Sequence, residues 1–258
     1  MQVKGVCFIG VKSRRFSSTV GLFRDVVGLE LVTERSDFVA FRTPDGDQLE
    51  VFGPRFGESD GSFSPNRVVC GFRVIDIDAA TSAIQAAGLA LLGPLQRSRR
   101  SAYAWQGFRG PDGLAYQLTF DPDSSTDRAK KGRMGVRGIS WVGVKTDQFD
   151  AMTSFCRLVL GLPTVLERSD FVVYRMLDGD KLELFGPRAE HPPHQFASNR
   201  VVCGFLVDDI ERARDALQDA GVELLGDLAR SSRSGSAWQH FRGADGFVYE
   251  LTFDPGHP

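Results

Sequence analysis

Four polar side chains that could carry acid–base chemistry or bind a metal recur at one position of a short motif. Each stands four residues after the glycine of an Asp-Gly turn: Glu50 in DGDQLE, Gln117 in DGLAYQ, Glu183 in DGDKLE and Glu250 in DGFVYE. Asp-Gly between β-rich runs predicts a tight hairpin, because glycine adopts the positive φ that such turns need. We therefore expect a carboxylate or an amide on the strand that follows each of four hairpins.

The alternation of side chains along these strands predicts where the acids point. Successive strand residues face opposite sides of a sheet, so Glu50 lies opposite Leu49 and Val51. If the apolar neighbours face helices, the acids face a cup, where a carboxylate needs a cationic partner or a raised pKa. Four basic residues alternate onto candidate cup positions: Lys12, Arg42, Lys145 and Arg175. Acid and base could merely neutralise each other, or the acid could anchor a ligand amine or hydroxyl within an aromatic box.

The chain is a tandem repeat, and the repeat defines its domains. ERSDFV at 34–39 recurs at 167–172, an offset of 133 residues (167 minus 34), and NRVVCGF at 66–72 recurs at 199–205 with the same offset. Residues 123–135 are small, polar and basic, which is typical of a linker. We predict a first domain at 1–122, a linker at 123–135 and a second domain at 136–258.

Each half is expected to contain two βαβββ modules. The first module reads as a strand at 6–12, a helix at 16–27 closed by Gly28, and strands at 30–34, 38–43 and 48–52. The second reads as a strand at 67–74, a helix at 77–87, and strands at 90–92, around Trp105 and at 114–120. The sequence therefore predicts an α+β fold of four modules, two per domain.

The composition excludes some classes of partner. The chain has 258 residues, 42% of them hydrophobic and 25% charged, with a formal net charge of −2, so no overall field attracts nucleic acid or an acidic membrane. No apolar run approaches the ~18 residues of a membrane span, and the N-terminus does not resemble a secretory leader. We expect a cytoplasmic protein. Its four cysteines, Cys7, Cys70, Cys156 and Cys203, form no CxxC pair, so neither a zinc knuckle nor a disulfide framework is indicated. Cys70 and Cys203, within the NRVVCGF strings, are expected to be buried small hydrophobic residues and not reactive thiols.

The motifs resemble those of one known superfamily over nearly the whole chain outside the linker. LFRDVVGL at 22–29, FCRLVLGL at 155–162 and the closing GADGFVYEL at 243–251, in this order and doubled, resemble the glyoxalase/bleomycin-resistance/dioxygenase (vicinal oxygen chelate) superfamily in a tandem two-domain form. The resemblance implies that each pair of modules forms a cupped mixed sheet around a pocket, with helices on the outer face. It implies no single reaction, because members include metal-dependent dioxygenases, isomerases, epimerases and thiol transferases, besides metal-free drug-sequestering proteins.

The resemblance also implies positions for a metal, and this chain departs from them. Metal-using relatives offer His or Gln on the opening strand of each module and His or Glu on its last strand. The opening positions here carry side chains that cannot bind a metal: Phe8, Val69, Trp141 and Val202. Only the closing positions keep an oxygen donor, so the imidazoles that transition metals usually require are lacking. We therefore expect no cofactor, although a weakly bound divalent metal stays open.

Three further side-chain types are candidates at the site. Trp105 and Trp238 lie in matching AWQ strings after arginine-rich stretches. They could be packed residues, or they could form a rim that stacks a flat ligand while an arginine pairs with an acidic group of that ligand. His240 is the one histidine in a predicted strand, where it could be a structural hydrogen bonder or a catalyst. His191 and His194 are expected in a loop, with adventitious metal uptake at most.

These residues favour a metal-independent binder of a small aromatic or polycyclic metabolite or antibiotic. The expected ligand-binding residues are Phe8, Glu50, Trp105, Gln117, Trp141, Glu183, Trp238 and Glu250. The alternative is a lyase, isomerase or dioxygenase acting in the second domain through Glu183, His240 and Glu250. We expect the cup of residues 136–255, with two carboxylates and a histidine, to be favoured over that of residues 3–122. The halves are expected to pack as an internal pseudo-dimer, in a monomer or weak homodimer, with the small-molecule ligand as sole partner.

Overall fold

The computed structural model describes residues 1–56, 63–99, 101–122, 134–190 and 196–257 as four βαβββ modules. The first module comprises β1 (Val3–Lys12), α1 (Phe16–Gly21), the π-helical η1 (Leu22–Val27), β2 (Glu30–Arg35), β3 (Phe38–Arg42) and β4 (Gln48–Phe52). The second comprises β5 (Val68–Val74), α2 (Ile77–Ala86), β6 (Gln96–Arg97), β7 (Ala104–Arg109) and β8 (Ala115–Phe120).

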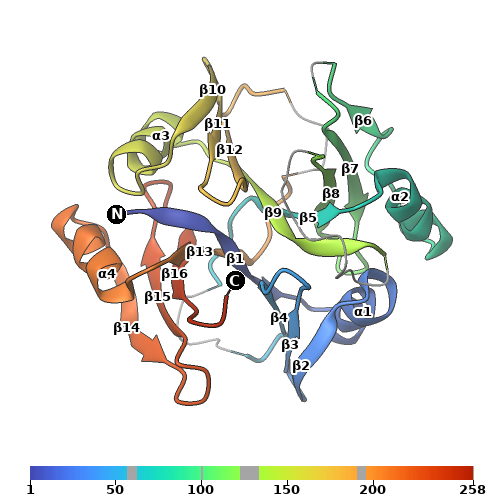
Figure 1. Ribbon diagram of the computed structural model, residues 1–258, viewed down its shortest axis with the longest axis horizontal. Helices are drawn as coiled ribbons and strands as arrows, with labels where there is room; N and C mark the ends of the chain where they lie inside the picture. Colours follow the sequence, from blue (N-terminus) through green and yellow to red (C-terminus); the bar gives the residue numbers. More distant parts are fainter. Residues whose placement is uncertain (57–62, 100, 123–133, 191–195, 258) are drawn as a thin grey trace.

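The second half repeats this order. Its third module comprises β9 (Val136–Lys145), α3 (Phe149–Leu158), β10 (Thr164–Arg168), β11 (Phe171–Arg175) and β12 (Lys181–Phe185). Its fourth comprises β13 (Val201–Val207), α4 (Ile210–Asp219), β14 (Leu224–Arg230), β15 (Ala237–Arg242) and β16 (Val248–Phe253). Figure 1 shows the helices α1 to α4 at the periphery and β1, β5, β9 and β13 crossing the centre.

Local sequence explains where the helices begin and end. Gly28 ends η1 with φ of 78°, a left-handed conformation that costs glycine little, and its N–H donates to the carbonyl of Phe23. The side chains of Asp76 and Asp209 accept backbone N–H groups at the starts of α2 and α4. One sequence expectation is wrong in detail, because residues 90–92 form no strand and only Leu91 makes a bridge, to Phe108.

The modules pair into two eight-stranded mixed sheets, which confirms the α+β class, but each module's partner differs from the expected one. The first sheet runs β14-β15-β16-β13-β1-β4-β3-β2, and the second runs β10-β11-β12-β9-β5-β8-β7-β6. The first sheet therefore joins the first module to the fourth, and the second sheet joins the second module to the third. The expectation that each sheet lies within one half, at 1–122 or 136–258, is wrong.

The two halves are joined by backbone hydrogen bonds along the central strands. β1 runs antiparallel to β13, with Ile9 opposite Cys203, and β5 runs antiparallel to β9. Asn66 and Asn199, the first residues of the two NRVVCGF strings, exchange backbone N–H···O bonds of 2.9 Å in both directions. The halves thus share both sheets, which is a closer union than two domains in contact.

Two hairpin aspartates, which the sequence reading passed over, fasten one half to the other. Asp180 accepts the backbone N–H of Val6 at 3.1 Å and pairs with the guanidinium of Arg73 at 2.7 Å. Asp47, at the matching position, accepts the N–H of Ile139 at 2.6 Å. Both aspartates are buried, so these bonds are shielded from water.

The remaining sequence expectations about the scaffold have mixed outcomes. All four cysteines are free and buried, and burial raises the pKa of the Cys70 thiol to about 12, so they behave as small hydrophobic residues. Of the expected linker, 123–133 lies outside the described residues, as do His191 and His194. No helix in the described part of the chain is both long and apolar enough to cross a membrane.

Candidate functional site

A cavity of about 490 Å³ lies on the first sheet and draws its walls from both halves of the chain. We call it the open cup. Aromatic side chains line one part of it, among them Phe8, Phe52 and Phe63, and two carboxylates with an imidazole line another: Glu50, Glu250 and His240. As expected from alternation, Leu49 and Val51 are fully buried on the other side of β4, while Glu50 faces the cavity.

The floor of the open cup is Phe8, which occupies the opening-strand position of the first module. Two glycines of the central strands make room for it: a Cβ on Gly204 would lie 2.8 Å from the Phe8 Cβ, and one on Gly10 would lie 3.1 Å from the far end of the ring. Val202, at the opening position of the fourth module, lines the same cavity. Phe8 and Val202, at the two positions where the resemblance leads one to expect metal ligands, thus form part of the apolar wall of the cavity.

The acid–base groups of the open cup are held by short-range contacts. Glu250 accepts a 2.6 Å hydrogen bond from the Thr252 hydroxyl and lies 3.2 Å from Nε2 of His240. Glu50 accepts a 2.5 Å hydrogen bond from the amide of Gln48. Burial, and next the charge of Glu250, raise the pKa of Glu50 from 4.5 to about 7, while Gln48 and His240 oppose the rise.

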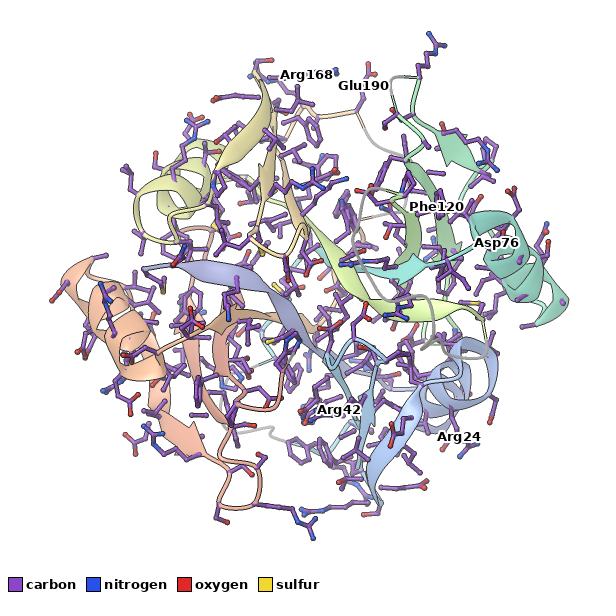
Figure 2. All side chains as sticks on the ribbon, in the orientation of Figure 1. Arg24, Arg42, Asp76, Phe120, Arg168 and Glu190 are labelled. Atoms are coloured by element: carbon purple, nitrogen blue, oxygen red, sulfur yellow. The ribbon has the colours of Figure 1, made fainter. Side chains whose placement is uncertain are left out.

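The rim of the open cup comes from β3, β15 and the end of β16. Arg42, labelled in Figure 2, lies between the β2–β4 and β14–β16 parts of the first sheet, and its guanidinium is 3.7 Å from a carboxylate oxygen of Asp254. Trp238 also lines the cavity. In the two arginine-rich stretches, Arg97 pairs with Asp78 on α2 and Arg230 pairs with Glu211 on α4. These ion pairs lie away from the cavity.

The corresponding place on the second sheet is occupied by side chains, and we call it the filled cup. Trp141 is the counterpart of Phe8, and it is 1% exposed under Phe196 and beside Val69. A Cβ on Gly143 would lie 2.3 Å from the Trp141 ring and 3.1 Å from the Phe196 ring, so the glycine is needed for this packing. Phe63, the counterpart of Phe196, packs in the matching way: it contacts Phe52 at the wall of the open cup with ring centroids 4.7 Å apart, as Phe196 contacts Phe185 at 4.9 Å.

The polar residues of the filled cup include a lysine, Lys181. Burial raises the pKa of Glu183 to about 7, and the Trp141 indole and the charge of Lys181 oppose the rise. The Lys181 ammonium lies 3.2 Å from Asp121 and 3.7 Å from the ring centroid of Tyr103. A hollow of about 170 Å³ remains on this side, lined by Trp105, Gly107 and Gln117 among others.

The structure therefore regroups the residues that sequence reasoning selected. Glu50 shares a cup with Glu250, His240 and Trp238, whereas Glu183 shares the other with Gln117, Trp105 and Trp141. The expectation that Glu183 and Glu250 face one cup within 136–255 is wrong, because β12 and β16 belong to different sheets. A cup with two carboxylates and a histidine does exist, but it is assembled from both halves.

The donor set does not fit a transition metal. Phe8 and Val202 in one cup, and Val69 and Trp141 in the other, offer no lone pair at the opening positions. Among the described residues, no three His, Cys, Asp or Glu side chains are grouped so that they could hold a metal ion. Elemental analysis of dialysed, tag-free protein is therefore expected to find far less than one Fe, Mn, Ni or Zn per chain. A content close to one would contradict this prediction.

The raised pKa of Glu50 has a consequence for stability. Because this pKa is about 7 in the folded chain, against an ordinary 4.5, the folded state holds its proton over a pH range in which the unfolded state loses it. This contribution to the free energy of unfolding therefore falls as the pH rises from about 4.5 to about 7. Glu50→Gln should remove it and raise stability at pH 8 by about 2 kcal/mol, with little effect at pH 4.5. Urea unfolding at both pH values measures this, and an equal effect at the two would refute it.

Comparison with known families identifies the class of protein. The chain matches the model of the Glyoxalase/Bleomycin resistance protein/Dioxygenase superfamily over residues 13–118 and 138–251, and it belongs to this superfamily. A comparison with curated proteins gives no significant match.

Solved structures share the fold across the whole chain. A Bacillus subtilis protein, provisionally assigned as a dioxygenase, has a TM-score of 0.73 at 15% identity, with 98% of this chain and 86% of that one covered. Glyoxalase I from Zea mays has a TM-score of 0.66 at 12% identity, with coverages of 97% and 92%. At these identities the likeness concerns the fold alone.

Proposed function

We propose that the protein binds a small aromatic molecule in the open cup without the help of a metal. The observation that carries this proposal is the cavity of about 490 Å³, a size typical of small-molecule sites, with aromatic walls and a few converging polar groups. The apolar walls would supply most of the binding energy, and Glu50, Glu250 and His240 would orient the ligand. A natural metabolite or an antibiotic would satisfy the same chemistry.

The repeat supports the proposal by contrast. In the filled cup Trp141 packs with Phe196 and Val69, and the hollow lined by residues of the second module beside it, of about 170 Å³, is about a third of the open cup's volume. Of these two cavities, one on each sheet, the one in the open cup is thus the larger. We infer one ligand site per chain, on the first sheet.

A direct test uses neutral aromatic probes, 2-phenylethanol and indole, in calorimetric titration. We expect saturable binding at one site. Ser236→Tyr should weaken it at least about tenfold, because Ser236 lines the open cup and the matched residue of the filled cup is Tyr103, whose ring would take up ligand space. Trp105→Phe, a control in the filled cup's hollow, should leave the affinity unchanged. Absence of saturable binding, or binding indifferent to Ser236→Tyr, would refute the proposal.

Acid–base catalysis is a second candidate, and one observation favours it. His240 and Glu250 lie 3.2 Å apart in the same cavity as Glu50, so a general acid and a general base could face one bound molecule. A lyase or isomerase activity would then belong to the open cup, and not to the second domain by itself. With a turned-over ligand in hand, Glu50→Gln should lower kcat at least about 100-fold.

A further inference from the structure

In the filled cup, the chain supplies its own cation beside an acid and an aromatic ring. The Lys181 ammonium lies over the Tyr103 ring at 3.7 Å and pairs with Asp121 at 3.2 Å. Its side chain is 18% exposed, and its charge acts on the buried carboxyl of Glu183. This is the arrangement in which a cation is held by both charge and a π face.

In the open cup, the repeat places other residues at these positions. Gln48 stands for Lys181, Ser236 for Tyr103 and Asp254 for Asp121, each at the 133-residue offset (181 minus 48). The register confirms the match, because Gln48 lies opposite Phe8 as Lys181 lies opposite Trp141. The open cup thus keeps both acids of the arrangement and lacks its ammonium.

Among the described residues, no lysine or arginine forms an ion pair with Glu50, and His240 is the basic group whose charge acts on it. Asp254 lies 3.7 Å from Arg42, and Glu250 lies beside His240. Lys12 donates to the carbonyl of Phe56, and Arg35 lines the cavity without being among the charges that act on Glu50. Glu50 accepts a hydrogen bond from the neutral amide of Gln48, and the nearby Glu250 carboxylate adds to the negative potential.

We propose that the open cup recognises an aromatic amine, whose ammonium group pairs with Glu50 beside Gln48, the position at which the other sheet carries Lys181. The proposal rests on the proposed ligand-binding function and specifies its ligand class. The phenyl rings of Phe52 and Phe63 would receive the aromatic body and add cation–π attraction for the amine. The Lys181 ammonium of the filled cup would thus correspond to the charged group of the ligand.

The test compares phenethylamine with its neutral isostere 2-phenylethanol by calorimetric titration of the full chain at pH 8. The amine is expected to bind about tenfold or more tightly, because a charge-assisted hydrogen bond replaces a neutral one. Gln48→Lys should abolish this preference by supplying the internal cation, and Glu50→Gln should bring the amine and the alcohol to similar affinity. Glu183→Gln, the matched change in the filled cup, should leave the preference unchanged.

The outcomes separate the two proposals. If both probes bind equally to the unmodified chain, the amine specificity is wrong while the ligand site stands. If neither probe binds, the proposed function itself fails. Thermal unfolding identifies a Gln48→Lys chain that does not fold, and in that case Glu50→Gln decides, because a persistent tenfold preference in that variant would overturn the pairing with Glu50.

Discussion

Either half of the chain expressed alone is expected not to form a stable monomer, whereas a chain cut within 123–133 is expected to stay assembled. The reason lies in the sheets: residues 1–122 hold only half of each, and they leave β1 and β5 without their central partners β13 and β9. Unpaired central strands expose apolar surface and backbone hydrogen-bonding groups that must find another chain. Light scattering and circular dichroism of the separate and co-expressed halves measure this.

The separate halves and the mixed halves are expected to behave differently. Separate halves should be unfolded, aggregated or self-associated, and mixing or co-expression should restore a one-to-one complex that unfolds cooperatively. A folded, monomeric half that binds an aromatic probe would show that one half can build a cup by itself. The shared sheets described above would then be unnecessary for function.

Replacing Asp180 with alanine is expected to lower the free energy of unfolding by about 3–5 kcal/mol. Asp180 is buried and accepts both the Val6 N–H at 3.1 Å and the Arg73 guanidinium at 2.7 Å. The Arg73 side chain is only 11% exposed, so its charge would be left in a poorly hydrated place without its partner. Urea unfolding monitored by fluorescence gives the difference.

Two controls make this prediction sharp. Asp208→Ala removes an exposed ion pair with Lys4, at 43% and 66% side-chain exposure, and should cost less than about 1 kcal/mol. Adding Arg73→Leu to Asp180→Ala should recover part of the lost free energy of unfolding. Leucine is already present at the matched position of the repeat, as Leu206 on β13. If Asp180→Ala costs no more than Asp208→Ala, the aspartate does not fasten the halves.

Local sequence determined the modules and the faces of their strands. The repeat, the Asp-Gly hairpins and the helix ending at Gly28 depend on residues close together in the chain, and strand alternation is enough to set Glu50 opposite Leu49 and Val51. The superfamily resemblance, now confirmed, follows from these motifs and their order. Phe8 and Trp141 could likewise be placed at the opening positions by counting along the chain.

Only the tertiary structure decided which modules share a sheet. β5 and β13 share the VVCGF string and differ only at Arg73 and Leu206, so the apolar pattern of the two strands does not tell β1 which of them to pair with. Ladder hydrogen bonds join backbone groups, which are alike in every residue, so the choice depends on the packing of the whole chain. For that reason Glu50 meets Glu250 and not Gln117.

The difference between the cups was also beyond the sequence. Phe63 and Phe196 are the same residue type at matched positions and pack alike, against Phe52 and Phe185 respectively, so they do not distinguish the cups. Whether a cup is filled depends on the summed volume of side chains from two modules, and the identity of those two modules is a tertiary fact. The sequence could nominate residues for the candidate site, but it could not group them into one open cup and one filled cup.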